Sequence, residues 1–362
     1  MIRVLHVLGG LGTGGTENLI MNWYRAIDRT RIQFDFLVRS SDQNFVDEIH
    51  DLGGEIYYTA SFPAHAVKNY RQTKELLKTG KWDVIHVHAN AALYMAPLTL
   101  AKKYGISCRI LHSHSVQPQK SIFEVVHNFN RKRLGKYTTE RLACSSKAGR
   151  WMFGDAPFKV LKNAIDIDSF LYSKADRNTV REEFGLVDRF VVGHVGRLAA
   201  VKNHGFLLEV FAKIREKRHD AALLLVGDGE LKDQILEKAK ALGLADSIVF
   251  TGRRNDVGKL MSAMDAFVLP SVFEGLPVVL VEAQANGLQC FSSKEITTEE
   301  VFITPKLHVI SLEESPQSWA NQILDIITGD KQRSGDKALL LQSGFGVESV
   351  ISELEKIYES GV

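Results

Sequence analysis

The sequence predicts an α/β protein made of two doubly wound parallel sheets, each in its own domain, with the two domains facing a cleft. The length of 362 residues exceeds that of one typical domain and suits two. Strand-like apolar runs alternate with helical patterns from end to end, which is typical of parallel sheets covered by helices on both faces. A polar, irregular stretch near residues 162–184 interrupts this alternation and indicates the boundary between the domains.

Six short apolar runs predict the strands of the first half of the chain. Helices fill the gaps between them, for instance over residues 16–27 and 70–79. The predicted strands are residues 3–8, 34–38, 55–58, 84–88, 109–113 and 141–144.

The second half repeats this alternation with five further strands. These are predicted at residues 190–195, 222–226, 247–251, 266–269 and 289–292, again with helices between them. A final helix near residues 348–360 follows a loosely patterned stretch, and we expect it to pack back on the first domain. The predicted division is therefore a first domain of residues 1–163, a second of residues 164–345, and a C-terminal helix within residues 346–362.

The composition is that of an ordinary globular protein, with 45% hydrophobic and 24% charged residues. The chain holds no apolar run of about 18 residues that could cross a membrane. Its first residues, Met1–Leu8, read as a strand and not as a signal peptide. Three scattered cysteines lack metal-type spacing and fit a reducing compartment. We therefore expect a cytoplasmic location.

Charge is distributed unevenly between the two halves. Residues 1–163 carry 23 Lys and Arg against 13 Asp and Glu, whereas residues 164–362 carry 22 against 30. A basic first half suggests that this half meets something anionic, such as phospholipid or a lipid-linked diphosphate. The alternative is an uneven surface charge that serves no partner. No nucleic-acid partner is expected.

Two glutamates separated by seven residues, Glu274 and Glu282, are the most informative pattern in the chain. Glu274 follows a buried-strand pattern, and Pro277 reads as the first residue of a helix that carries Glu282. The free N–H groups of a helix N-terminus can hold a phosphate, and the carboxylates can accept hydroxyls on either side of it. This arrangement suits a nucleotide sugar. Alternatively, the carboxylates only stabilise the helix dipole.

Glycines and cations occur at two other strand exits. Gly10, Gly12 and Gly15 have the spacing of a dinucleotide-binding loop, but Arg39 closes the second strand where that fingerprint needs an acidic residue. An NAD-dependent oxidoreductase is therefore disfavoured, although the loop still resembles a phosphate-approaching turn. Arg197 and Lys202 leave a strand of the second half together, and two fixed cations are what a departing diphosphate needs.

Four histidines stand in pairs at two predicted strand ends. They are His86 and His88 on one strand, and His112 and His114 on the next. Alternate residues share one face of a strand, so each pair could bind a metal, but no carboxylate or cysteine completes an obvious ligand set. We expect no metal site and no cofactor. Asp166-Ile-Asp168 formally matches a metal-binding Asp-x-Asp signature, and its place in the linker indicates a chance match.

Together these motifs resemble the retaining glycosyltransferases of the GT-B fold, family 4, also called glycosyl transferases group 1. The strongest part is the segment 273–287, which matches the family's E-x7-E signature with its flanks. Gly196-Arg197 with Lys202-Asn203, the strand 223–229 and Gly14-Gly15-Thr16-Glu17 add to it. The resemblance covers nearly the whole chain and is closest to bacterial exopolysaccharide and capsule transferases.

The resemblance implies two Rossmann-like domains, the first for the acceptor and the second for a nucleotide-sugar donor, most simply a UDP-sugar. It implies retention without a metal, with the leaving phosphate oxygen taking the acceptor's proton. Glu274 would bind the donor sugar and Glu282 the ribose, while Arg197 and Lys202 hold the diphosphate. The other implied donor-binding residues are Gly14, Gly15, His114 or His112, Arg254 in the base-reading loop, and Gly275, Leu276 and Val278 through their backbone.

The acceptor is expected to be a glycan or a lipid-linked oligosaccharide. Residues 120–136 carry apolar side chains at 122, 125, 126 and 129, at helical spacing, followed by the basic cluster 131–133. This segment could lie on the anionic inner face of the cell membrane or be a core helix with basic flanks. Two other functions stay open, namely a non-catalytic nucleotide- or lipid-binding partner subunit and a UDP-sugar epimerase of the same fold.

Overall fold

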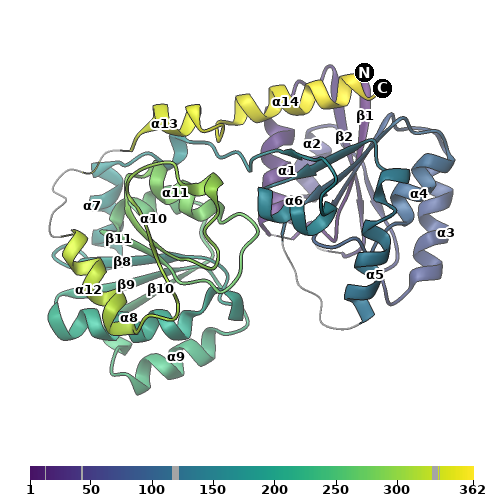
Figure 1. Cartoon of the computed structure of the whole chain (residues 1–362). Coiled ribbons are helices and arrows are strands. Elements are labelled where there is room, and N and C mark those ends of the chain that lie inside the picture. The colour runs from purple at the N-terminus through teal and green to yellow at the C-terminus, as the bar shows by residue number, and fades with distance from the viewer. Residues whose placement is uncertain (13, 42–43, 116–121, 328–332, 334) are drawn as a thin grey trace. The chain divides into compact units, whose positions relative to one another are not determined.

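The computed structural model describes residues 1–12, 14–41, 44–115, 122–327, 333 and 335–362. The chain divides into two compact units (Figure 1). Unit 1 comprises Met1–Ala164 together with Gly344–Val362, and unit 2 comprises Ile165–Ser343. Each unit contains a parallel sheet with helices, so the predicted α/β class with two doubly wound sheets is confirmed.

Unit 1 is built on a seven-stranded sheet in the order β3-β2-β1-β4-β5-β6-β7, in which every pair is parallel. The strands are β1 (Ile2–Val7), β2 (Ile32–Val38), β3 (Ile56–Tyr58), β4 (Val84–Ala89), β5 (Cys108–Ser113), β6 (Glu140–Ala143) and β7 (Lys159–Val160). The helices are α1 (Gly15–Ala26), α2 (Val46–Asp51), α3 (Ala66–Leu77), α4 (Ala96–Lys103), α5 (Ile122–Arg131), α6 (Ser146–Phe153) and α14 (Val347–Ser360).

The last helix of the chain, α14, forms part of the unit 1 core. It lies beside α1 (Figure 1), and its buried face joins the cluster formed by α1, β1 and β2. Five of its residues are buried, namely Val350, Ile351, Leu354, Ile357 and Tyr358. Their spacing of three and four residues is that of one helix face packed on a core.

Unit 2 contains a six-stranded sheet in the order β10-β9-β8-β11-β12-β13, again wholly parallel. The strands are β8 (Phe190–Val195), β9 (Ala221–Val226), β10 (Ile248–Gly252), β11 (Ala266–Leu269), β12 (Gln289–Ser293) and β13 (Leu307–Ile310). The helices are α7 (Lys174–Glu183), α8 (His204–Lys217), α9 (Lys232–Ala241), α10 (Val257–Ala263), α11 (Val278–Ala285), α12 (Pro316–Ile327) and α13 (Lys337–Gln342).

Both sheets reverse their winding beside the strand that comes first in sequence. The reversal lies between β1 and β4 in unit 1 and between β8 and β11 in unit 2. Ligands of open α/β sheets bind at this switch point, outside the carboxyl ends of the strands. The loops after these four strands are therefore the places to look for a site.

Some elements differ from the sequence-based prediction. The edge strands β7 and β13 were missed, because β7 has only two residues and β13 has only four, with His308 interrupting its apolar residues. Pro277 is the N-cap of α11, and Val278 is its first helical residue. Among the described residues, no helix combines the length and the hydropathy needed to cross a membrane.

Candidate functional site

The switch point of unit 2 brings together a lysine and a glutamate. Lys202 ends the turn after β8, and Glu274 lies in the loop after β11. Nζ of Lys202 lies 2.6 Å from Oε1 of Glu274, and their side chains are only 15% and 17% exposed. Because water is largely excluded, the two charges interact more strongly than an exposed pair would. The sequence predicted both residues for the site but not their contact with each other.

The backbone around Lys202 is shaped for this placement. Asn203 has φ of 54°, the only positive φ outside glycine in the described parts of the chain, and α8 starts directly after it. A Cβ at Gly196 would lie 3.0 Å from Cε of Lys202. Glycine at position 196 therefore leaves the room in which the lysine stem lies.

Glu282 lies on α11 and is partly buried. Burial raises the pKa of its carboxyl from the ordinary value of 4.5 to about 7, and the nearby charge of Lys202 opposes this rise. Lys202 therefore acts on both glutamates of the E-x7-E pattern. Leu276 is 7% exposed, and the Val278 amide donates to its carbonyl at 2.9 Å. Of the predicted backbone donors, Val278 is thus already engaged within the protein, and Gly275 lies in the loop beside Glu274.

The raised pKa of Glu282 predicts a pH-dependent stability. Between about pH 4.5 and pH 7 the folded state holds a proton that the unfolded state has released. The stabilisation is therefore complete at low pH and is lost as the pH rises through 7, by up to about 3 kcal/mol. Urea unfolding of the wild type and Glu282→Gln across this range should give a difference that grows with pH. Parallel curves would contradict the assignment.

The two arginines predicted for the site lie in ion pairs of their own. Arg197 is 73% exposed, and its Nε lies 3.1 Å from Glu230, which is 54% exposed. The Arg254 guanidinium contacts Asp256 at 2.8 Å and Glu183 at 3.0 Å, and these bonds raise its pKa. The described structure thus brings Lys202, but neither arginine, into contact with Glu274.

Two buried histidines beside Lys202 were missed by the sequence analysis. Nδ1 of His194 lies 2.9 Å from the Val268 carbonyl and must donate to it. The His194 and His204 rings meet edge to face, 4.7 Å apart. Burial lowers the pKa of both, and the charge of Lys202 adds to this effect. His194 and His204 are therefore neutral imidazoles beside Lys202.

In unit 1, the glycine loop after β1 leads into α1. Gly14 is the N-cap of α1 with φ of −75° and ψ of 168°, and Gly15 is its first residue. A Cβ at Gly14 would lie 2.4 Å from Oε2 of Glu17. Because glycine has no side chain, the Glu17 carboxylate in the first turn of α1 fits beside position 14. This carboxylate lies next to the backbone amides that were predicted to approach a phosphate.

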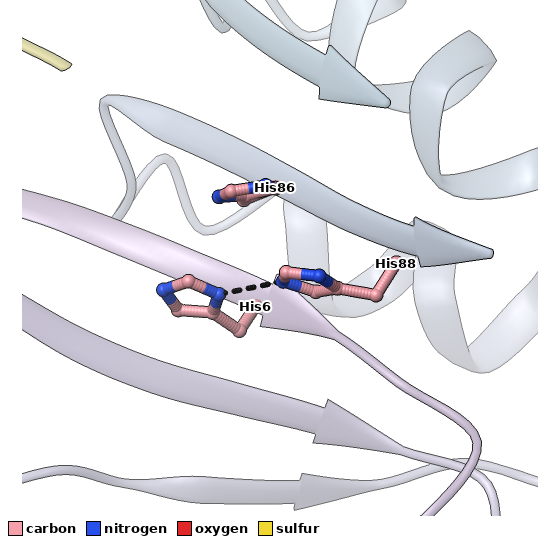
Figure 2. Close-up of side chains that lie close together, drawn as sticks. All are labelled: His6, His86 and His88. Atoms are coloured by element: carbon pink, nitrogen blue, oxygen red, sulfur yellow. Dashed lines mark hydrogen bonds between the residues drawn. The ribbon is translucent and has the colours of Figure 1, made fainter. Parts of the chain in front are cut away.

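The four predicted histidines lie in one buried cluster with a fifth, His6 on β1. Figure 2 shows His6 together with His86 and His88. His6 was missed because it stands alone in its strand. The sheet order places β1 next to β4, and His6 pairs in register with His86. Burial lowers the pKa of all five rings, so that they are neutral.

Two triplets in this cluster hold ligand-type atoms within 4.8 Å of one another. They are His6, His86 and His88, and His88, His112 and His114. Most of these ring nitrogens are hydrogen-bonded to one another, and we therefore describe the cluster as a hydrogen-bond network. The two aspartates of the Asp-x-Asp match contact Ser169 and Lys337 instead.

Two family models match consecutive parts of the chain. Glycosyltransferase Family 4 matches residues 13–169, and glycosyl transferases group 1 matches residues 176–335. Among curated proteins, the chain is 34% identical to EpsF of Bacillus subtilis, a protein named as a glycosyltransferase, over 98% of this chain and 96% of EpsF. It is 26% identical to the capsular polysaccharide biosynthesis glycosyltransferase CapH of Staphylococcus aureus, over 99% of both chains.

A third relative and a solved structure carry names that include a ligand. The chain is 29% identical to the UDP-Gal:alpha-D-GlcNAc-diphosphoundecaprenol alpha-1,3-galactosyltransferase of Escherichia coli, over 60% of this chain and 59% of that protein. The crystal structure of Anabaena HepE in complex with UDP superposes with a TM-score of 0.81, at 20% identity, over 99% of this chain and 100% of HepE. At this identity the similarity to HepE shows the fold.

Proposed function

The chain belongs to the glycosyl transferases group 1 family, and from this we propose that it moves a sugar from a UDP-sugar to an acceptor hydroxyl with retention at the anomeric carbon. The observation that carries the proposal is the shielded contact between Lys202 and Glu274 at the switch point of unit 2. A cation beside a carboxylate suits a donor that has a diphosphate next to sugar hydroxyls.

The proposed roles follow from the charges. Lys202 stabilises the negative charge that develops on the leaving diphosphate. Glu274 accepts hydroxyls of the sugar, and Glu282 accepts hydroxyls of the ribose. Arg197 supplies a second cation, since its exposed bond to Glu230 can be exchanged at little cost. The bond between the anomeric carbon and the leaving phosphate oxygen breaks, and the acceptor oxygen bonds to that carbon from the same face. The leaving phosphate oxygen takes the acceptor's proton. No metal is needed, because lysine, arginine and helix amides balance the charge.

Two names among the relatives support UDP as the nucleotide, the UDP complex of HepE and the UDP-Gal of the galactosyltransferase. A thermal-shift panel of UDP, GDP and ADP with their sugars should show stabilisation by UDP, much reduced in Glu282→Ala. Glu216→Ala, an exposed carboxylate of the same unit, is the matched control. No shift with any nucleotide would overturn the proposal. Stabilisation without transfer to any acceptor would favour the non-catalytic partner subunit.

For the acceptor we propose a lipid-linked glycan presented at an anionic membrane surface. The support is α5, on which His127 is the one buried residue. Nδ1 of His127 accepts from the Ala92 amide at 3.0 Å and so fixes the helix. Large apolar side chains of α5 are exposed by 37% to 66%, namely Ile122, Phe123, Val125, Val126 and Phe129. The structure therefore does not support the alternative of a core helix.

Basic residues follow the apolar face at Arg131, Lys132 and Arg133. A helix with an apolar face and flanking cations binds at the interface of anionic lipid. Lys120, the first residue of the predicted segment, lies outside the described residues. We infer peripheral contact with the membrane through α5.

Replacing Val125 and Phe129 together by Asp should weaken binding to vesicles containing phosphatidylglycerol at least tenfold, because both apolar contact and electrostatic attraction are lost. Vesicle sedimentation measures this. Val67→Asp is the control, since Val67 is 68% exposed on α3 of the same unit. Equal losses in both variants, or none in either, would contradict the role of α5.

A further inference from the structure

A cavity of about 500 Å³ lies in unit 1 at the carboxyl ends of β2 and β3. Arg39 directly follows β2, Tyr58 is the last residue of β3 and Thr59 comes next, and all three line the cavity. Its size is within the range of ligand sites, roughly 300–1,000 Å³. Because ligands of open α/β sheets bind outside the carboxyl ends of the strands, this cavity lies where a ligand is expected.

The Arg39 guanidinium at this cavity has no carboxylate partner among the described residues. Arg39 is half-buried, and burial lowers the pKa of its guanidinium. Its Nε donates to the Leu8 carbonyl at 3.3 Å, and its Cζ lies 4.4 Å from the centre of the Tyr94 ring. These contacts hold the side chain in place, while neither of its two terminal nitrogens has a hydrogen bond to a described residue.

Two other half-buried arginines of unit 1 differ in this respect. The Arg3 guanidinium contacts the Asp35 carboxylate at 2.7 Å, and the Arg109 guanidinium donates to three backbone carbonyls. A buried cation without a partner is unfavourable, and the terminal N–H groups of Arg39 are free to bind an anion from outside the chain. Arg39 therefore indicates an anionic ligand.

A second cation, a helix end and polar side chains form the rest of the cavity wall. Lys68 is exposed on α3, and His65 is the N-cap of α3 and makes no side-chain cap bond. Nδ1 of His65 lies 3.0 Å from the Ser61 hydroxyl, so that Nε2 of His65 is left for a ligand hydroxyl. No Asp or Glu of the described ranges lines the cavity. The wall thus favours an anion that also carries hydroxyl groups.

The charges of the wall suit a phosphate better than a carboxylate. A guanidinium can bind a phosphate through two parallel hydrogen bonds. The two cations match the charge of a phosphate monoester, which is about −1.5 to −2 at pH 7. Tyr58 is 47% exposed and offers an aromatic ring to the apolar face of a sugar. A phosphate joined to a sugar therefore uses more of this wall than phosphate alone.

We propose that this cavity binds a glycosyl phosphate, whose phosphate contacts Arg39 and Lys68 and whose sugar lies beside Tyr58. The proposal rests on the acceptor proposed above and deepens it, since a glycan linked to a lipid diphosphate carries this group. All the residues concerned belong to unit 1. The site is therefore complete within one unit.

Titrations of the full chain, with ¹⁵N-labelled arginine and histidine, report on the cavity directly. Glucose 1-phosphate should shift the Arg39 Nε–H signal and the His65 ring signals saturably. Glucose, inorganic phosphate and NADP⁺ should bind at least tenfold more weakly; NADP⁺ is included because an arginine after this strand can also bind its 2′-phosphate. The signal of Arg25, which forms an exposed pair with Glu48, should not move. No shift at Arg39, an equal response at Arg25, or equally tight binding of phosphate alone or NADP⁺ would overturn the proposal.

Variants test the two phosphate contacts. Arg39→Gln should raise the Kd of glucose 1-phosphate, followed at His65, at least tenfold, because charge-assisted bonds to the phosphate are lost. Lys68→Gln changes an exposed position, should raise the Kd at least threefold, and decides the question if Arg39→Gln does not fold. Arg25→Gln is the matched control and should leave the Kd within about twofold. An unchanged Kd in either of the first two variants would refute the proposed contacts.

Transfer assays separate this site from the enzyme function. With a panel of farnesyl diphosphate-linked sugars as acceptors, Arg39→Gln should raise the KM for the acceptor at least tenfold and change kcat less than threefold. An unchanged acceptor KM, despite weaker binding of glucose 1-phosphate, would assign the cavity to a soluble sugar phosphate and overturn its role for the acceptor. If the wild type transfers no sugar, the proposed function fails, whereas the titrations still decide what the cavity binds.

Discussion

Replacing Lys202 by Met should lower kcat/KM for sugar transfer by about two to three orders of magnitude, the usual effect of removing a group that stabilises transition-state charge. Lys202 is the one cation that contacts Glu274 in the described structure, and its charge also acts on Glu282. Arg197, the proposed second cation, is 73% exposed and therefore stabilises the leaving diphosphate less strongly. Steady-state assays with the UDP-sugar found in the thermal-shift panel measure the effect.

A loss of stability could mimic this result, because Lys202→Met leaves the shielded Glu274 carboxylate without its partner. The double variant Lys202→Met with Glu274→Gln removes both charges, and it should recover stability without recovering activity. Lys238→Met is the matched control, since Lys238 forms an exposed pair with Glu209 in the same unit. A loss in Lys202→Met of less than tenfold would refute the proposed role of Lys202.

Deleting residues 346–362 should abolish the cooperative folding of unit 1. The deletion removes α14 with its five buried residues. Burial of a large apolar side chain contributes roughly 1.5–3 kcal/mol, so the loss is about 7–15 kcal/mol, as large as the whole stability of a typical domain. Hydrogen exchange followed by mass spectrometry should show unprotected strands in unit 1 and protected strands in unit 2.

A shorter truncation after Ser360 controls for the presence of an altered C-terminus. It removes only Gly361 and Val362, the latter 58% exposed, and should leave exchange in unit 1 close to that of the wild type. Protected strands of unit 1 in the long deletion would show that α14 is dispensable for this core.

The fold class could be predicted from sequence because strands buried on both faces leave strong apolar runs. Phe190–Val195 and Ala266–Leu269 were predicted with the bounds that the structure has. Of the four edge strands, β3 and β10 were predicted, whereas β7 has only two residues and β13 only four, and these short strands were missed. The sequence placed the division after residue 163, and the structure divides the chain after Ala164.

The site was only partly predictable, because motifs identify residues and not their partners. Lys202 and Glu274 were each expected to meet the donor, but their direct contact depends on the β8–β11 neighbourhood, which arises only when the sheet is ordered. Arg254 looked like a donor-binding residue, and in the structure Asp256 and Glu183 hold it. His6 could have been found by combining the strand order typical of a doubly wound sheet with the alternation of residues on a strand face.

The division of the chain also determines the order in which its parts can be completed during synthesis. Unit 1 needs α14, which is synthesised after all of unit 2. At about 5–20 residues per second, some tens of seconds pass between the completion of Ala164 and that of Val362. During this interval α1, β1 and β2 expose the apolar surface that α14 later covers. The second unit can therefore complete its fold first, whereas the first unit cannot complete its core until α14 is made.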